Sequence, residues 1–179
     1  MTDRVVSREE WGTIQVRLLW LVLETVAWRL LGEKGLEFVK EFYEEAAKTW
    51  LSIMEKDYGV VTKKAKTLKE AVENYIEVGV AGWLFRSKTD FILEEEDKKR
   101  LKIKVFRCPW SAHCIDMLKH PPFVGPTPFE AKSPKQLLTC PRIGCFRGAV
   151  KLLANIKCDY RLITSDPPKI CEGEITVIE

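Results

Sequence analysis

The segment from Cys140 to Cys171 restricts the fold most, because it combines a helix signal with two strand signals. Pro141 suits the first position of a helix and biases Cys140 towards an extended conformation. Apolar residues then recur at three- and four-residue steps to about Asn155, which predicts an amphipathic helix. Alternating strands follow at 160–164 and 174–178, around a turn at 165–168. The segment therefore predicts a helix and then a β-hairpin.

The residues ahead of this segment predict three helices. Ser7 and Thr67 begin capping-box patterns, which place the starts of the first and third helices there. Gly32 and Gly59 are suited to end the first and second helices. A second β-hairpin, with a charged turn, is expected over 91–105.

This order of elements predicts an α+β fold. N-terminal helices are expected to pack on an antiparallel sheet of about four strands, with a glycine-bearing helix before the last two strands. The length of 179 residues fits a single domain over 1–179, with a helical part at 1–84 and a cysteine-bearing part of sheet and helix at 85–179.

Charge and hydropathy argue against several partners. The formal net charge is only +3, and Lys98–Arg100 follow the acidic run Glu94–Asp97, so we expect no nucleic acid. No apolar run approaches the ~20 residues that span a bilayer, so we expect no membrane span. The first ten residues lack a signal-peptide pattern, which favours a cytoplasmic protein. The abundance of Lys and Glu is typical of a thermophile.

All six cysteines lie after residue 107, and three hypotheses for them remain open. They pack as small apolar side chains, they bind a metal, or they act as redox or nucleophilic thiols. Thiolates bind zinc well, and a histidine beside them adds a nitrogen ligand. The candidate zinc ligands are Cys140, Cys171, Cys108, Cys145 and His113.

Two further kinds of site are compatible with the pattern. Cys140 is expected at a helix N-terminus, where the helix dipole favours a thiolate, so it is the candidate nucleophile if the chain is an enzyme. Aromatic residues of the same half of the chain are candidates for an apolar ligand pocket, although such residues also form cores. They are Trp110, Trp83, Phe123 and Phe129.

The pattern from Leu101 to Glu179 resembles the 4-vinyl reductase domain superfamily. The likeness rests on a strand that ends near Cys108-Pro109, the helix with glycines that follows Cys140, and the spacing from Asp166 to Cys171. That superfamily includes L-2-amino-thiazoline-4-carboxylic acid hydrolase-like proteins and, more distantly, TRAPP-complex subunits. The resemblance implies an α+β fold, frequent dimerisation, small hydrophobic ligands and, in phenol-sensing relatives, a zinc site, of which Cys140 and Cys171 match ligand positions.

Three functions follow as hypotheses. The leading one is a small-molecule-binding or sensor-type domain with a cysteine site for zinc. The alternatives are a thiol-dependent hydrolase of a small cyclic or amide substrate, with His113 as the base, and a non-catalytic assembly subunit. The first helix has apolar stripes on two sides between Trp11 and Trp28, which predicts a homodimer through this helix or, alternatively, its burial at the centre of the domain.

Overall fold

A computed structural model describes residues 8–108, 110–111, 114–115, 124–125, 136–166 and 169–178 of the chain. The helices and the strands of the main sheet follow one another along the chain in the order expected from the sequence. The described elements are α1 (Arg8–Leu31), α2 (Lys34–Tyr58), α3 (Leu68–Ala81), η1 (Lys88–Asp90), β1 (Phe91–Asp97), β2 (Arg100–Phe106), β3 (Val124–Gly125), β4 (Gln136–Leu137), α5 (Pro141–Ala149), η2 (Val150–Ala154), β5 (Cys158–Asp166) and β6 (Ile170–Val177).

The predicted helix ends are set by local hydrogen bonds. The Thr67 hydroxyl accepts a bond of 3.1 Å from the backbone N–H of Glu70, and the Glu70 carboxylate accepts one of 2.7 Å from the N–H of Lys66. The first bond is that of the predicted N-cap, and the second reaches the residue before the cap, one position earlier than in a standard capping box. Gly59 ends α2 with a left-handed φ of 67°, a conformation that glycine adopts without steric cost.

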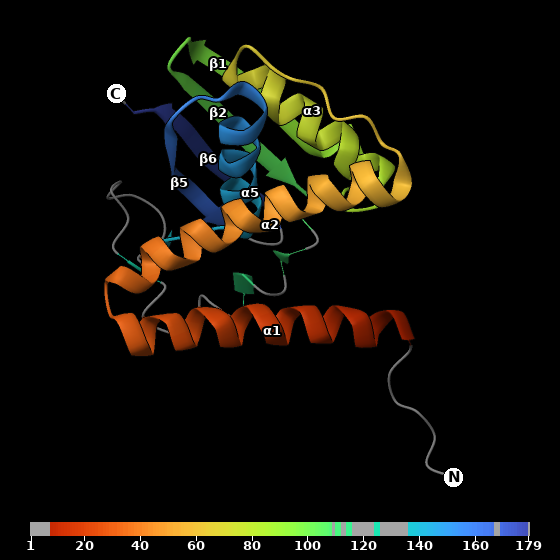
Figure 1. The fold of residues 1–179 in the computed structure, drawn as a ribbon. Coiled ribbons are helices and arrows are strands. Elements are labelled where there is room, and N and C mark those ends of the chain that lie inside the picture. The colour runs from red at the N-terminus through yellow and green to blue at the C-terminus, as the bar shows by residue number, and fades with distance from the viewer. Residues whose placement is uncertain are drawn as a thin grey trace.

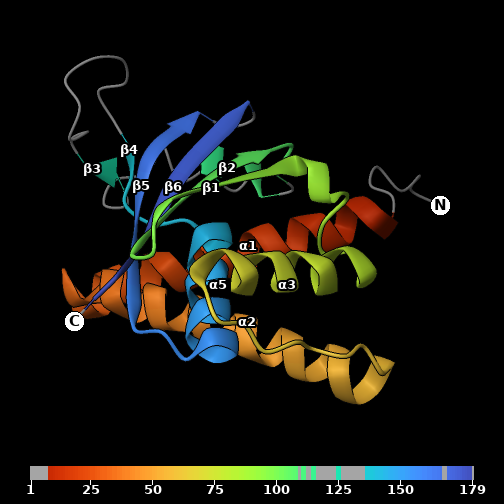
Figure 2. The same cartoon turned by 90° about the horizontal axis from the view of Figure 1, so that it is seen from above.

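β1, β2, β6 and β5 form one antiparallel sheet in that order. Leu93 pairs with Ile103 across the first hairpin, and Val105 of β2 pairs with Cys171 of β6. Alternate residues of β2 are buried, because one face of the sheet is covered by α3 and α5 (Figure 2). The predicted α+β class and the antiparallel sheet of four strands are confirmed.

α5 is the most enclosed helix among the described elements, because it lies between the sheet and α2 (Figure 1). Its two glycines allow the contact with α2. A Cβ atom on Gly144 would lie 2.5 Å from a ring carbon of Tyr43, and one on Gly148 would lie 2.9 Å from Cα of Glu44. On the sheet side, a Cβ atom on Gly173 would lie 2.9 Å from Ile143, so α5 is in close contact on both sides.

α1 packs on α2 at the outside of the domain (Figure 1). Trp20 faces inward and contacts the rings of Tyr43 and Trp110, with centroids 5.2 and 4.7 Å apart, and the Tyr43 hydroxyl donates to the buried carboxylate of Glu24. The side away from Trp20 exposes the large apolar side chains Leu18, Leu19, Val22 and Leu30. The alternative of α1 as the buried central helix is therefore wrong, and α5 has that position.

Despite these exposed leucines, no helix in the described ranges is long and apolar enough to cross a membrane.

Candidate thiol site

Four cysteines from separate parts of the chain line a single pocket beside the N-terminus of α5. The rest of the lining is apolar, apart from two cationic residues and one serine. The residues that line the pocket are Val105, Cys108, Ser111, Cys114, Cys140, Arg142, Lys169, Ile170 and Cys171. The structure thus joins Cys108, Cys140 and Cys171 as predicted, and it adds Cys114.

The positions of Cys171 and Cys108 follow from the pairing of the sheet and from one unusual backbone conformation. Cys171 lies opposite Val105 in the β2–β6 ladder, close to the end of β2. The chain leaves β2 through Arg107, whose φ of 48° is left-handed and unfavourable for a residue with a side chain. This turn places Cys108 beside the pocket, and the N–H of Ser111 then donates to the carbonyl of Cys108 over 3.1 Å.

Cys140 is the N-cap residue of α5, as the Cys-Pro pair predicted. Its backbone is extended, with φ −148° and ψ 122°, and its carbonyl accepts a bond of 2.9 Å from the N–H of Gly144. Beside it, the hydroxyls of Thr139 and Tyr160 lie 2.6 Å apart in a buried hydrogen bond. The start of the helix is therefore fixed to β5, and the Cys140 side chain lines the pocket from there.

Burial and the neighbouring thiols raise the pKa values of three cysteines that line the pocket. Burial raises the pKa of Cys140, and the neighbouring Cys108 and Cys171 raise it further, while the backbone N–H groups of Ile143 and Arg142 oppose the shift. Burial likewise raises the pKa of Cys171 to about 11, again with a contribution from Cys108. The pKa of Cys114 rises well above its usual value through burial and then through Cys140, Cys108 and Cys171. The four sulfurs are thus close enough to influence one another's charge.

The pocket has space for one small species. It leaves about 10 Å³ for the centre of a water-sized sphere, which corresponds to roughly one water molecule. All six cysteines are free thiols in the structure. As they stand, no three His, Cys, Asp or Glu side chains of the described residues form a group that could hold a metal ion.

Arg142 is a buried charged residue of this lining that the sequence analysis missed. It lies in the first turn of α5, only 2% exposed, and its guanidinium carbon lies 4.1 Å from the centre of the Phe85 ring. Its Nε and Nη2 atoms are buried without a hydrogen-bond partner. A cation in the first turn of a helix opposes the helix dipole, which is the sequence signal that singles out this residue.

Of the other two predicted ligands, Cys145 does not line the thiol pocket. Cys145 lies on another side of α5 beside Tyr75, and burial raises its pKa to about 11. His113 lies outside the described residues.

Of the four aromatic candidates for a ligand pocket, the two that the structure describes lie apart. Trp110 packs on Trp20, whereas Trp83 is 92% exposed at the far end of α3. Phe123 and Phe129 lie outside the described residues.

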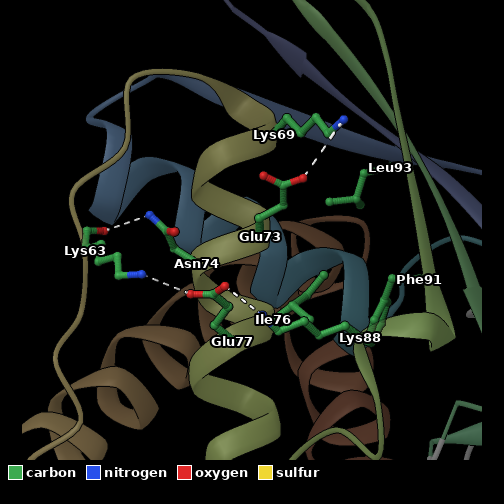
Figure 3. Close-up of a pocket in the computed structure, with 9 residues that line it drawn as sticks. All are labelled: Lys63, Lys69, Glu73, Asn74, Ile76, Glu77, Lys88, Phe91 and Leu93. Atoms are coloured by element: carbon green, nitrogen blue, oxygen red, sulfur yellow. Dashed lines mark hydrogen bonds and ion pairs between the residues drawn. The ribbon is translucent and has the colours of Figure 1, made fainter.

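Two larger hollows lie away from the thiols. One, of about 470 Å³, lies between α3, the segment before it and β1, and its ionic groups pair with one another (Figure 3). Glu77 binds Lys88 over 2.7 Å and Lys63 over 3.3 Å, so one carboxylate is shared by two lysines. The other, of about 600 Å³, is a mainly apolar groove at the ends of α2 and α3, lined by Trp50, Ile53, Met54, Tyr58, Val60, Ala81, Gly82 and Trp83.

No protein-family model matches this chain, and no curated protein is significantly similar to it in sequence.

Proposed function

We propose that this chain is a small-molecule-binding or sensor-type domain whose thiol pocket holds a zinc ion. The observation that carries the proposal is the convergence of Cys108, Cys114, Cys140 and Cys171 on one pocket with space for about one atom. A distant relationship to the 4-vinyl reductase domain superfamily is part of the same proposal. It is supported by the α5–β5–β6 order and by the positions of Cys140 and Cys171 within it.

The donor chemistry of the pocket fits zinc. Four thiolates satisfy the tetrahedral preference of a structural zinc site, and the ion would supply the positive charge that allows these crowded thiols to ionise. Cys171 in β6, Cys108 after β2 and Cys140 at α5 belong to three different elements. A bound ion would therefore link the sheet to the central helix, and its free energy of binding would add to the stability of the fold.

The groove at the ends of α2 and α3 is the proposed place for a small hydrophobic molecule. Its volume of about 600 Å³ lies in the range typical of ligand sites, which the thiol pocket does not reach. Trp83 has a left-handed φ of 60° at the edge of this groove, and such strain in a bulky residue is found mainly where function requires it. Trp50 Nε1, beside it, is buried without a hydrogen-bond partner.

The thiol-hydrolase hypothesis is less well supported. A nucleophilic cysteine needs a depressed pKa, and burial together with two neighbouring thiols raises that of Cys140. The backbone N–H groups at the helix N-terminus lower the pKa of Cys140, but burial and the two neighbouring thiols raise it by more.

Metal analysis combined with thiol counting tests the proposal. The protein is purified without chelator, and zinc and iron per chain are measured beside the thiols that react in the native state. We expect about one zinc ion per chain, and we expect at most the two thiols outside the pocket, those of Cys145 and Cys158, to react in the native state. Metal below ~0.2 per chain with six reactive thiols would remove the metal site from the account.

We also propose that two copies of the chain form a homodimer through the outer face of α1. Leu18, Leu19, Val22 and Leu30 are exposed on this face, contiguous exposed apolar side chains mark interaction sites, and a two-fold dimer is the commonest symmetric way to cover them. Trp20, which faces inward, is not part of this surface.

Replacing Leu19 by Glu should convert the dimer into a monomer. Leu19 is 68% exposed, so the change costs the monomer fold little, whereas a charge at the centre of an apolar interface prevents association. Light scattering should give about twice 20.7 kDa for the unchanged protein and 20.7 kDa for Leu19→Glu. Leu152→Glu, at an exposed leucine of η2, is the control and should stay dimeric. A mass of 20.7 kDa for the unchanged protein at high concentration would contradict the dimer.

A further inference from the structure

The hollow between α3, the segment before it and β1 combines apolar and charged side chains in one cavity. Its volume of about 470 Å³ lies in the range of small-molecule sites. Ile76 of α3, which is 4% exposed, and the half-buried side chains of Phe91 and Leu93 in β1 form its apolar floor. Lysine, glutamate and asparagine side chains complete the lining (Figure 3). The hollow can therefore cover an apolar group and present charge beside it.

The charged part of this lining has more positive than negative charge. It consists of two glutamates and three lysines, namely Glu73, Glu77, Lys63, Lys69 and Lys88. One carboxylate oxygen of Glu77 lies 2.7 Å from Lys88, and the other lies 3.3 Å from Lys63. Among the described carboxylates, that of Glu77 alone lies within 4.0 Å of either ammonium group. One carboxylate thus serves two ammonium groups, which leaves one positive charge in excess.

The surrounding sequence adds to this positive charge. Residues 63–88 include six basic and three acidic residues, so the excess in this stretch equals the net charge of +3 of the whole chain. Hydrogen bonds from Lys88 and then Lys63 lower the pKa of Glu77, which shows that both ammonium groups act on the same carboxylate. Positive charge of this kind around an apolar cavity attracts anionic ligands.

The backbone holds Lys63 and Lys88 in place on either side of Glu77. The side-chain amide of Asn74 donates to the carbonyl of Lys63 over 3.2 Å, which ties this residue to α3. Lys88 begins η1, whose N-terminus is capped by the hydroxyl of Ser87. Each ammonium group has three N–H donors, of which the described side chains occupy one through Glu77. Donors at fixed positions are therefore present before a second anion binds, which lowers the cost of binding.

We propose that this hollow binds a small organic acid as its anion, with the acid group between Lys63 and Lys88 and the apolar body on the floor. The groove at the ends of α2 and α3 suits a different ligand, because no lysine or arginine lines it. The inference is independent of that groove and of the proposed zinc ion, since neither site shares a lining residue with this hollow. Glu77 competes with the ligand for both lysines and so limits its affinity.

The test uses two fluorescent probes with the same aromatic rings, anilinonaphthalene sulfonate, which is anionic, and phenylnaphthylamine, which is neutral. The folded protein is titrated with each at low ionic strength, where exposed charges are least screened. Replacing both Lys63 and Lys88 by Gln should weaken binding of the anionic probe about tenfold. Glu77→Gln should strengthen it about three- to fivefold, in line with the usual strength of exposed charge pairs. Binding of the neutral probe should not change in either variant.

Two further variants serve as controls. Glu45→Gln removes the carboxylate of another lysine pair, 3.2 Å from Lys48 on α2, and should leave both probes unaffected. Trp83→Ala alters the apolar groove and should leave the anionic probe unaffected. The replaced side chains at the hollow are at least 43% exposed, so the fold should be retained, and circular dichroism checks this.

Each outcome decides the inference without touching the proposed metal site. The inference is wrong if the unchanged protein does not bind the anionic probe, or if the double lysine variant binds it equally well. Equal gains in Glu77→Gln and Glu45→Gln would also overturn it, because they would reflect net charge and not a site. Weaker binding in Trp83→Ala alone would place the probe in the groove, which contradicts this inference and supports the groove as a ligand site.

Discussion

Replacing Cys140 by Ala should abolish stoichiometric zinc binding, whereas replacing Cys158 by Ala should leave it intact. The two cysteines are almost equally buried, at 5% and 1% exposure, and both are in contact with α5 or part of its start. Only Cys140 lines the thiol pocket. Losing one of four ligands should weaken binding by more than the roughly 100-fold that is typical of outer-shell changes.

The two variants can be compared directly because neither substitution should disrupt the fold by itself. The Cys140 side chain makes no capping hydrogen bond at the start of α5, so alanine removes little helix stabilisation. Zinc per chain and the chelator competition curve are measured for both variants beside circular dichroism spectra. If Cys140→Ala keeps one zinc ion per chain, or if Cys158→Ala loses it to the same extent, the pocket is not the metal site.

Replacing Phe146 by Ala should lower the free energy of unfolding by about 3–5 kcal/mol, the usual cost of removing a buried aromatic ring. Phe146 is fully buried in α5, and its ring meets those of Tyr75, Phe85 and Phe91 at centroid distances of 5.9, 6.0 and 5.5 Å. These partners belong to α3, to the segment after it and to β1. The ring therefore joins the helical layer to the sheet.

Urea denaturation of Phe146→Ala and of Phe38→Ala measures this contribution. Phe38 lies on α2 and is 46% exposed, so its replacement should change the free energy of unfolding by well under half as much. Equal losses in the two variants would mean that the aromatic cluster around α5 is not the centre of the core.

The parts of this fold that the sequence predicted are those with local causes. The N-cap at Thr67 and the helix end at Gly59 need only residues three or four positions away. The Cys140-Pro141 start of α5 is equally local, because proline itself restricts the backbone of both residues. Each of these signals acts within one turn of chain, so the later packing of the domain does not alter it.

The thiol pocket was only partly predictable because it is assembled across the fold. Cys140 and Cys171 stood out through the resemblance and the helix start, but Cys114 joins them only because the chain turns after β2. Cys145, nearer in sequence to Cys140, lies on another side of the same helix, since five residues span almost one and a half turns. Arg142 likewise carries no motif, and its role depends on what surrounds it once α5 is buried.

The sequence also could not predict which side of α1 faces inward. A helix with apolar residues on two sides has no unique inner face, so the pattern alone does not select one. Tyr43 and Trp110, distant in sequence, select the side that carries Trp20. The leucines then remain outside, and this selection by tertiary contacts is what exposes the proposed dimer surface.

X-ray absorption at the metal edge of the natively purified protein tests the central claim most directly, because it counts the atoms bound to the ion. The account predicts zinc with four sulfur neighbours at about 2.3 Å, the distance of a zinc–thiolate bond. It also predicts that Cys140→Ala no longer gives this four-sulfur signal. A shell with fewer than four sulfurs in the unchanged protein, or no bound metal, would contradict a metal centre built from Cys108, Cys114, Cys140 and Cys171.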